Sequence, residues 1–459
     1  MIDIDSYGLD VAIRADDVPF ACRVRLAVRN TGSEPVDRFV FRLHSELDVH
    51  EILDESGAPL VHGVRIEAYD LAYTSDIAVH SASLSPPIGP GEKRTLTAVY
   101  GGPFSPSSAR SPSDYMRIDE EGAYLRGTGY SIWFPVQEDY DWNTAATFAV
   151  VLDVPAAWRP LAFGDLDSEE MRNGRNVSRW RAESAWPLLF CHLAATAWDI
   201  VEEGPFRVYH RRTVESRSAA AEYVRIGAEL LSFYRANYGS RPSTQRVFLA
   251  ELCPYGGISA GNVIGIPSDR FAEVTDEGKA EETLELLAHE LVHGFVIPAV
   301  VPDVPGSALL IEGFPSYFHS LALEEVLKGR FYERFVRRAW TSYHERRRAQ
   351  GTPSSDLPPE VPLLELRDSD IGRYKDVFLL DDRFVVLLDR LRALIGPEAF
   401  LRGTREFLDR HRTAPARFTD FVSALESASA KRLDDFVARW FGTTEALPAA
   451  WAPGTPESG

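Results

Sequence analysis

Two histidines one helical turn apart carry the clearest chemistry in this sequence. His289 and His293 enclose Glu290 in the order His-Glu-Leu-Val-His. Because an α-helix makes one turn in about 3.6 residues, both imidazoles project from one side of a helix and can ligate one metal ion. Glu290 lies beside them, where a carboxylate can polarise a metal-bound water. The three residues predict a zinc site that activates water.

A catalytic zinc site needs a third protein ligand and one open position. Glu312 meets this need, since eighteen residues separate it from His293 and it lies where a second helix, buried on one face, is predicted to begin. The chain contains eleven histidines, so on the order of a few in a hundred such sequences would carry the motif by chance. Glu312, taken alone, would more often be a surface carboxylate.

The helix that must position the two histidines is amphipathic. Between Glu281 and Val296, six apolar residues recur at helical spacing, which predicts a largely buried helix. They are Leu284, Leu287, Ala288, Leu291, Val292 and Phe295. Before this helix, the pattern predicts strands over Phe206–His210 and Arg246–Leu252 and a helix over Ser218–Tyr238. After it, nearly all segments are helical in pattern, so an α/β region is followed by a helical one.

The first two hundred residues have a different pattern. From Asp10 to about Glu203, short runs of alternating or β-branched residues are separated by Gly, Pro and Asn, which is typical of strands. We therefore predict an N-terminal domain over residues 1–203, a second domain over 204–447 and a flexible tail over 448–459. The first domain is expected to be a mostly antiparallel sandwich or saddle of sheets.

Composition narrows the class of protein. The 459 residues include 49 basic and 68 acidic side chains, so the formal charge is 49 − 68 = −19. Such a surface disfavours nucleic acid and anionic membranes as partners. Three scattered cysteines argue against a disulfide framework, and the acidic start of the chain lacks the pattern of a secretory signal. We expect a cytoplasmic monomer or small homo-oligomer that does not bind membranes.

The spacing of the motif resembles that of one enzyme family. His-Glu-x-x-His, eighteen residues and then Glu-Gly-Phe-x-x-Tyr resemble the gluzincin aminopeptidases, which include aminopeptidase N and the leukotriene-hydrolase enzymes. Trp133-Phe134-Pro135 and the strand that follows it are similar to the family's N-terminal β-domain. The resemblance implies an α+β chain in which an antiparallel β-sandwich or saddle precedes a thermolysin-like catalytic domain with a small sheet and a helical lobe.

The resemblance also assigns roles to residues. It implies that His289, His293 and Glu312 bind one Zn²⁺ per chain, and that Glu290 is the general base and acid in the hydrolysis of a peptide substrate. The family uses a tyrosine about sixty residues after the third ligand to stabilise the oxyanion. Tyr374, 62 residues after Glu312, is the candidate, in a segment that resembles the family's Tyr-x-Lys-Gly pattern without copying it. A phenol there can donate to charge that develops in the transition state.

The segment that should recognise the substrate departs from the family. Aminopeptidases of this family carry Gly-x-Met-Glu-Asn before the zinc helix, and its glutamate binds the free α-amine. The candidate substrate-binding residues at this place are Gly256, Gly257, Ile258, Ser259 and Ala260. The glycines are kept, but Ser259 or Ala260 stands where the carboxylate should be. The family's second acidic anchor aligns near Arg126, whose cation would oppose an ammonium group and suit a carboxylate or a carbonyl.

These departures leave several functions open. Family members usually continue into a large helical domain after the catalytic domain, so we expect a more open cleft and an endopeptidase or dedicated peptide-processing enzyme becomes plausible. The alternatives are a non-catalytic peptide-binding scaffold and a zinc hydrolase of an epoxide or ester. Residues 257–261 also satisfy Gly-x-Ser-x-Gly, the nucleophile elbow of serine hydrolases. The extended run that follows, ending at Pro267, argues against an elbow.

Overall fold

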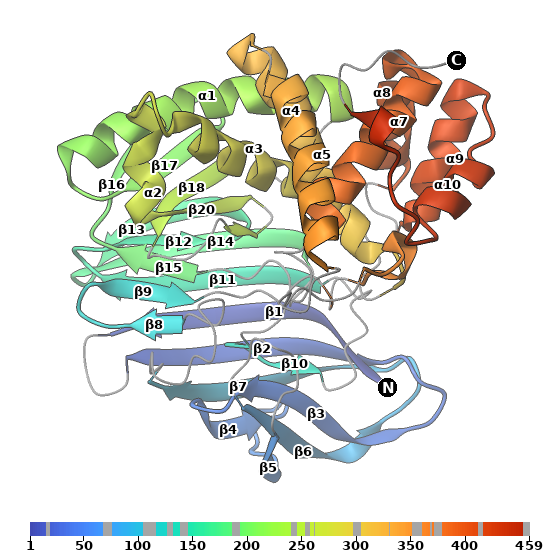
Figure 1. The fold of residues 1–459 in the computed structure, drawn as a ribbon. Helices are drawn as coiled ribbons and strands as arrows, with labels where there is room; N and C mark the ends of the chain where they lie inside the picture. The colour runs from blue at the N-terminus through green and yellow to red at the C-terminus, as the bar shows by residue number, and fades with distance from the viewer. Residues whose placement is uncertain are drawn as a thin grey trace. The chain divides into compact units, whose positions relative to one another are not determined.

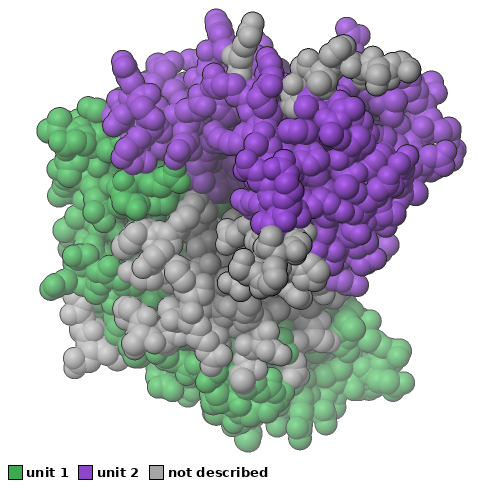
Figure 2. All heavy atoms as spheres, in the orientation of Figure 1, with its two compact units in different colours: residues 1–221, 243–272 green, residues 222–242, 273–459 purple. Residues whose placement is uncertain are grey.

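A computed structural model describes most of the chain and divides it into two compact units. The described residues are 1–14, 19–67, 76–103, 116–125, 132–137, 146–185, 193–239, 246–252, 258–260, 262–296, 304–329, 331–350, 360–367, 370, 379–411 and 416–452. Unit 1 comprises Met1–Ala221 and Ser243–Ala272, and unit 2 comprises Glu222–Pro242 and Glu273–Gly459 (Figure 2). The predicted boundary between residues 203 and 204 stays a proposal.

The largest sheet of unit 1 has seven strands in the order β13-β14-β11-β1-β2-β7-β4 (Figure 1). Their bounds are β1 Ile2–Ile13, β2 Phe20–Asn30, β4 Asp48–Leu53, β7 Lys93–Gly102, β11 Ala146–Pro155, β13 Asp165–Arg172 and β14 Arg175–Ala185. Along β2, buried residues alternate with more exposed ones, as expected of a sheet with one covered face. The neighbouring strands pair antiparallel except β1 and β11, which are parallel.

Two four-stranded sheets complete the N-terminal β-region. One has the order β10-β3-β6-β5 and the other the order β12-β15-β9-β8. Their bounds are β3 Val36–His44, β5 His62–Glu67, β6 Ile77–Ile88, β8 Met116–Ile118, β9 Gly122–Leu125, β10 Val136–Gln137, β12 Arg159–Ala162 and β15 Leu193–Thr196. All their ladders are antiparallel, which confirms the predicted class of this region.

A mixed five-stranded sheet follows, in the order β16-β17-β18-β20-β19. Its strands are β16 Asp199–Glu203, β17 Phe206–His210, β18 Val247–Leu252, β19 Ile258–Ala260 and β20 Val263–Pro267. The three central strands are parallel, whereas β16 and β19 pair antiparallel at the two ends. The predicted small sheet is therefore present, and β17 begins and ends where the sequence pattern places it.

Helices make up the rest of the described chain. Their bounds are α1 Val214–Tyr238, α2 Ser268–Phe271, α3 Ala280–Val296, α4 Phe314–Leu327, α5 Phe331–Gln350, α7 Phe384–Ile395, α8 Pro397–Arg410, α9 Phe418–Ser429 and α10 Asp434–Trp440. Short 3₁₀ turns lie at η3 Ala272–Thr275, η6 Leu363–Glu365 and η9 Ala449–Trp451, and π-helical turns at η5 Leu309–Gly313 and η8 Leu379–Arg383. No helix among the described residues combines the length and apolar character needed to cross a membrane.

Aromatic side chains dominate the core of unit 2. Phe314, at the start of α4, has its ring centroid 4.7 Å from that of Phe421 in α9, in an edge-to-face arrangement. Phe407, Phe384 and Phe418 extend the cluster, and all are buried. Fully burying such a side chain stabilises the fold by about 1.5–3 kcal/mol. This cluster fixes α4, and with it the residues just before α4.

One guanidinium group is completely buried in unit 2. Arg383, at the end of η8, has no solvent-exposed surface. It donates to Oε1 of Glu360 at 2.6 Å and to the hydroxyl of Tyr343 at 3.1 Å. It also donates to three backbone carbonyls of the C-terminal segment, those of Trp440, Thr443 and Glu445. A buried charge is tolerated when it is paired and hydrogen-bonded in this way.

Candidate metal centre

Helix α3 presents three metal-binding side chains in one place. His289, Glu290 and His293 each offer a ligand atom, and these atoms lie within 4.8 Å of one another. The imidazole centroids of the two histidines are 4.9 Å apart. Glu290 and His293 are buried and His289 is largely buried. The predicted helix thus brings its histidine pair together on one side.

Glu312 joins this group from η5. Its Oε2 lies 3.3 Å from Nε2 of His289 and 3.9 Å from Nε2 of His293. Oε2 of Glu290 is 3.9 Å from the same His293 nitrogen. Ligands about 2.0–2.2 Å from a tetrahedral zinc ion are about 3.3–3.5 Å apart, so the spacing and the nitrogen and oxygen donors fit a zinc ion with little adjustment. All four residues belong to unit 2.

A π-helical turn and a glycine set the position of Glu312. The turn η5 contains Glu312 and runs directly into α4. A Cβ atom at Gly313 would lie 2.6 Å from two ring carbons of Phe384 in α7, closer than non-bonded carbons approach. The absence of a side chain at this residue therefore lets the start of α4 pack against α7. π-turns of this kind often occur at functional sites.

Helix α3 is held beside the site by a buried hydroxyl. Tyr234, in α1, donates its hydroxyl hydrogen to the carbonyl oxygen of Ala288 at 2.9 Å. Ala288 immediately precedes His289, and both residues of this hydrogen bond are buried. The bond links helices 54 residues apart in the chain and contributes about 1 kcal/mol.

The surrounding charges favour a cation at His289. Burial lowers the pKa of its imidazole, but the hydrogen bond and charge of Glu312 and the charges of Glu290 and Asp381 raise it, and the net pKa is above 6.5. Asp381, in η8, accepts a hydrogen bond from the hydroxyl of Ser316 at 2.5 Å. A divalent cation gains from the same carboxylates.

A third histidine lies beside the pair and was not predicted. His319, in α4, donates from Nδ1 to the carbonyl oxygen of Pro315 at 2.9 Å, and its ring centroid is 6.0 Å from that of His289. Burial first, and then the charge of His289, lower its pKa to about 3, so the ring is neutral. It follows Glu312 by seven residues, about two helical turns, and this spacing is the signal that could have revealed it.

Several predicted site residues are outside the described residues. These are Tyr374, Arg126, Gly256 and Gly257. Ile258–Ala260 form β19, which pairs antiparallel with β20 and places Ser259 opposite Ile264. A nucleophile elbow passes from a strand into a helix, whereas the strand that carries Ser259 is followed by another strand. The structure therefore gives no support to the serine hydrolase alternative.

Known proteins are similar to parts of this chain. Residues 269–440, which include all four residues, match the model of the peptidase family M1 domain. An aminopeptidase N from Streptomyces lividans is 25% identical over 177 residues, 38% of this chain and 20% of its own length. The mitochondrial aminopeptidase 2 of Saccharomyces cerevisiae is 21% identical over 308 residues, 65% of this chain and 31% of its own. The chain thus matches between a fifth and a third of the length of these curated relatives.

Solved structures are similar over nearly the whole chain. An M1 zinc metallopeptidase from Deinococcus radiodurans superposes with a TM-score of 0.70 and 18% identity, covering 99% of this chain and 96% of that one. A variant of the same enzyme bound to a Tyr-Ser-Ala substrate gives a TM-score of 0.71 with the same identity and coverage. The N-terminal β-region and the helical lobe predicted from the sequence are both part of this shared fold. Residues 269–440 thus match the peptidase family M1 domain, and the chain has the fold of the M1 zinc metallopeptidases.

Proposed function

We propose that this protein hydrolyses peptide bonds with a water activated by one zinc ion per chain. One observation carries the proposal: imidazole nitrogens of His289 and His293 lie within 4 Å of carboxylate oxygens of Glu290 and Glu312. These residues lie in the segment that matches the peptidase family M1 domain. The Deinococcus relative, whose fold is similar, is described with a bound tripeptide substrate, which supports a peptide as the substrate here.

In this proposal, His289, His293 and Glu312 hold the zinc ion. When bound, zinc polarises the scissile carbonyl and lowers the pKa of its water to near neutrality. Glu290 accepts the proton of the attacking water and then delivers it to the departing amine. Its burial strengthens these proton transfers because the surrounding water cannot compete for the carboxylate. The three ligands and the base are all provided by unit 2.

Tyr374 is proposed as the donor to the oxyanion. The proposal rests on the family resemblance and on its position 62 residues after Glu312. A phenol donates a hydrogen bond without adding charge, so it stabilises the negative oxygen of the transition state more than the neutral carbonyl of the substrate. Tyr374→Phe is expected to reduce kcat by about 10²–10³-fold and to leave KM within a few-fold.

Recognition of the substrate is proposed to differ from that of aminopeptidases. β19 is the last strand of its sheet in the described chain, so its free edge can pair with an extended peptide. The segment from Gly256 to Ala260 supplies no carboxylate for a free α-amine, and the family's second acidic anchor aligns near Arg126. Internal cleavage, or processing of one dedicated peptide, follows from these two changes. The protein is further proposed to be a cytoplasmic monomer or small homo-oligomer.

Peptides in matched free and N-acetylated forms test the proposal. The purified protein is incubated with both forms, with and without a zinc chelator, and the products are identified by mass spectrometry. Chelator-sensitive internal cuts in both forms support the endopeptidase proposal. Trimming of the free peptides alone would replace it with aminopeptidase activity, and cleavage that survives removal of zinc would contradict the mechanism.

Two variants of α3 separate catalysis from metal binding. Glu290→Gln keeps zinc at one ion per chain and lowers turnover by at least about a thousandfold, because the amide cannot accept the proton. Glu282→Gln, at an exposed position near the start of the same helix, is the matched control and retains full activity. A non-catalytic scaffold would show zinc and peptide binding without turnover in the unaltered protein, and ester or epoxide turnover alone would indicate the remaining alternative.

A further inference from the structure

His319, in α4, has one buried nitrogen that lacks a partner. The residue is 5% exposed, and its Nδ1 lies 2.9 Å from the carbonyl oxygen of Pro315. A carbonyl only accepts, so Nδ1 carries the hydrogen and Nε2 of the neutral ring is an acceptor. Within the described part of the chain, Nε2 has no hydrogen-bond partner. A buried polar atom in this state requires a donor.

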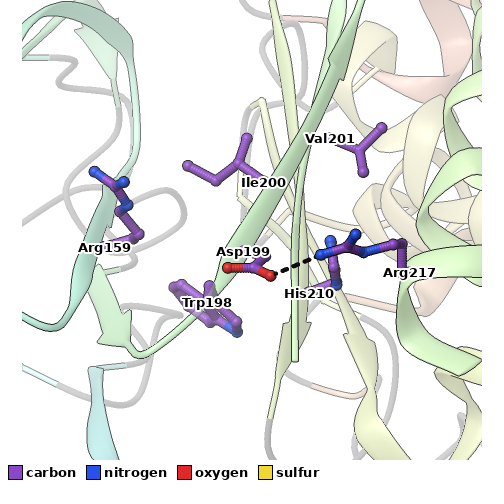
Figure 3. A pocket seen from close by; sticks show the side chains of 7 residues that line it. All are labelled: Arg159, Trp198, Asp199, Ile200, Val201, His210 and Arg217. Atoms are coloured by element: carbon purple, nitrogen blue, oxygen red, sulfur yellow. Dashed lines mark hydrogen bonds and ion pairs between the residues drawn. The ribbon is translucent and has the colours of Figure 1, made fainter. Parts of the chain in front are cut away.

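The buried imidazole of His210, in unit 1, provides a comparison. It lines a cavity of about 510 Å³ together with Arg159, Asp199 and Arg217 (Figure 3). The charges of this cavity are paired, because Arg217 lies 3.2 Å from Asp199 and Arg159 lies 3.2 Å from Glu169. Neither nitrogen of His210 is among the buried atoms that lack a partner in the described chain. The missing donor is therefore a feature of His319 and not of buried histidines in general.

Of the rings that lie beside His319 in the described chain, only that of His289 can supply a donor. The centroid of Phe335 is 4.7 Å away, that of His289 is 6.0 Å away and that of Phe331 is 6.3 Å away. A phenyl ring carries no N–H or O–H group. The charge of Arg338 also acts on His319, but this guanidinium donates to both oxygens of a carboxylate in α3, at 3.2 and 2.5 Å.

His289 has the complementary need for an acceptor. Its Nε2 lies 3.3 Å from the carboxylate of Glu312, so Nε2 is the nitrogen available to the proposed zinc ion and Nδ1 carries the hydrogen. Metal-ligating histidines almost always donate this second N–H to an acceptor, which fixes the tautomer and the orientation of the ring. Among the described residues, the other contacts of the His289 ring are with His293 and His319, and no carboxylate or carbonyl accepts from Nδ1.

We propose that His319 is a positioning residue that accepts a hydrogen bond from Nδ1 of His289 when the zinc ion is bound. The inference rests on the zinc site of the proposed function. In a direct N–H···N bond the two ring centroids would be about 5 Å apart. The separation of 6.0 Å therefore closes by about 1 Å, or is bridged by one water molecule.

One helical segment would then hold His289 through both of its nitrogens. Glu312, in η5, lies beside Nε2, and His319 follows it by seven residues in the helix that continues from η5. The acceptor keeps His289 in the tautomer whose Nε2 is free to bind zinc. An imidazole acceptor is neutral, so it orients the ligand without adding a further negative charge beside the zinc ion.

Three substitutions of His319 separate the acceptor from the packing of the ring. His319→Gln places a carbonyl oxygen close to the position of Nε2, whereas His319→Asn is too short to do so and His319→Leu has no polar atom. Zinc dissociation constants of the full chain are measured by chelator competition. The visible spectrum of the Co²⁺-loaded protein reports the geometry of the ligands. Melting temperatures report the stability of each variant.

The acceptor-free variants should lose metal affinity. His319→Leu and His319→Asn are expected to weaken zinc binding about 10–100-fold and to shift the cobalt bands, and His319→Gln is expected to stay within about threefold of the unaltered protein. Phe335→Leu is the matched packing control, because this buried ring lies edge-to-face against His319. It should lower the melting temperature and leave zinc affinity within about threefold.

Two results would overturn the proposal. Unchanged zinc affinity and cobalt bands in His319→Leu and His319→Asn would show that His289 does not depend on this acceptor. Equal losses of zinc affinity in His319→Gln, His319→Leu and Phe335→Leu would assign the effect to packing. Zinc affinity is measured without a peptide, so an unaltered protein that binds zinc and cleaves no peptide would contradict the proposed function alone. An unaltered protein that binds no zinc would refute both.

Discussion

Two regions of this molecule contain largely buried histidines, and the charged groups beside them differ. In unit 2, His289 and His293 are surrounded by the carboxylates of Glu290 and Glu312. In unit 1, His210 shares its cavity with two guanidinium groups and one carboxylate. An imidazole can ligate a cation or hydrogen-bond an anion. Which of the two an imidazole does depends on the charged groups beside it, and at His289 and His293 those groups are carboxylates.

The two sites also differ in how the chain assembles them. The metal centre takes three of its four residues from one helix, where a spacing of four residues brings side chains together. The cavity of unit 1 depends on a strand register that places Asp199 opposite His210 and on the first turn of a helix. A substitution at the metal centre should therefore affect the binding of one metal ion. A substitution among the residues around His210 should also disturb the strand pairing that brings them together.

Removing one imidazole should break the cation site completely. His293→Ala is expected to lose the bound zinc and to lower peptide hydrolysis by at least about a thousandfold, since two protein ligands do not hold a catalytic zinc ion. Metal content by mass spectrometry and a peptide assay measure both effects. His50→Ala, at an exposed histidine of β4, is the control. Zinc retained at full stoichiometry by the His293 variant would refute its assignment as a ligand.

A methyl group at Gly313 should displace a carboxylate of the cation site without removing it. The added Cβ of Gly313→Ala would lie 2.6 Å from the ring of Phe384, so η5 must shift and move Glu312. We expect zinc affinity to fall about 10–100-fold and the free energy of unfolding to fall by about 1–3 kcal/mol. Chelator competition and denaturant titration measure these changes.

The control for this variant is another helix-end glycine. A Cβ at Gly329 would meet its nearest neighbour, the carbonyl oxygen of Leu327, at 3.7 Å, which is ordinary contact. Gly329→Ala should leave zinc affinity unchanged. Unaltered zinc affinity in Gly313→Ala would show that the position of Glu312 does not depend on the contact with Phe384.

Another buried histidine, His80, sharpens the comparison because no ion pair at its ring is recorded among the described residues. His80, in β6, stacks on Phe41 with centroids 5.1 Å apart. Burial first, and then the charge of His62, lower its pKa from 6.5 to about 4, against a weaker opposite effect of Asp48. The unfolded chain therefore binds more protons between these values, so stability is fully present above pH 6.5 and is lost as the pH falls towards 4.

His80→Phe should flatten this dependence. The melting temperature of the unaltered protein is expected to fall by a few degrees more than that of the variant between pH 6.5 and pH 4.5. Thermal melts across this range measure the difference. Parallel curves for the two proteins would show that His80 does not contribute to the acid sensitivity of unit 1.

The smallest effect is expected from a change at Tyr234, because this residue supports the metal centre only through its hydrogen bond to the backbone of α3. Tyr234→Phe removes the hydroxyl that donates to the carbonyl of Ala288. We expect the free energy of unfolding to fall by about 1 kcal/mol and zinc affinity to change less than threefold. A larger loss of zinc affinity would mean that this hydrogen bond positions His289 as well as stabilising α3.

The sequence predicted which residues the candidate metal centre brings together, because most of that information is local. Helical periodicity identified α3 and its histidine pair, and the need for a third ligand, together with the family resemblance, pointed to Glu312. Two features were not predicted. The π-turn η5 departs from the 3.6-residue period of an α-helix. His319 can be recognised as a neighbour of the metal centre only because its ring lies close to that of His289 in space. Tyr374 and Arg126 stay predictions, because both are outside the described residues.

For the fold, too, local features were predicted and the pairing of distant segments was not. Strand patterns and the change to helical patterns correctly predicted a β-rich region followed by an α/β region and a helical one, because the sequence of each strand or helix shows which of its faces is buried. The order of strands did not follow from these patterns. β1 pairs parallel with β11, with Ser6 beside Thr147, and only tertiary packing selects a partner about 140 residues away. The cavity of unit 1 depends on such pairing, which is why His210 was predicted only as the end of a strand.

The buried guanidinium of Arg383 has a consequence for synthesis of the chain. Three of its hydrogen-bond acceptors are carbonyls of Trp440, Thr443 and Glu445. A ribosome adds these residues long after the zinc ligands have been made. Until they leave the exit tunnel, packing Arg383 in the core would strand a charge without its acceptors. The helical unit therefore reaches its final structure only after Glu445 has left the exit tunnel.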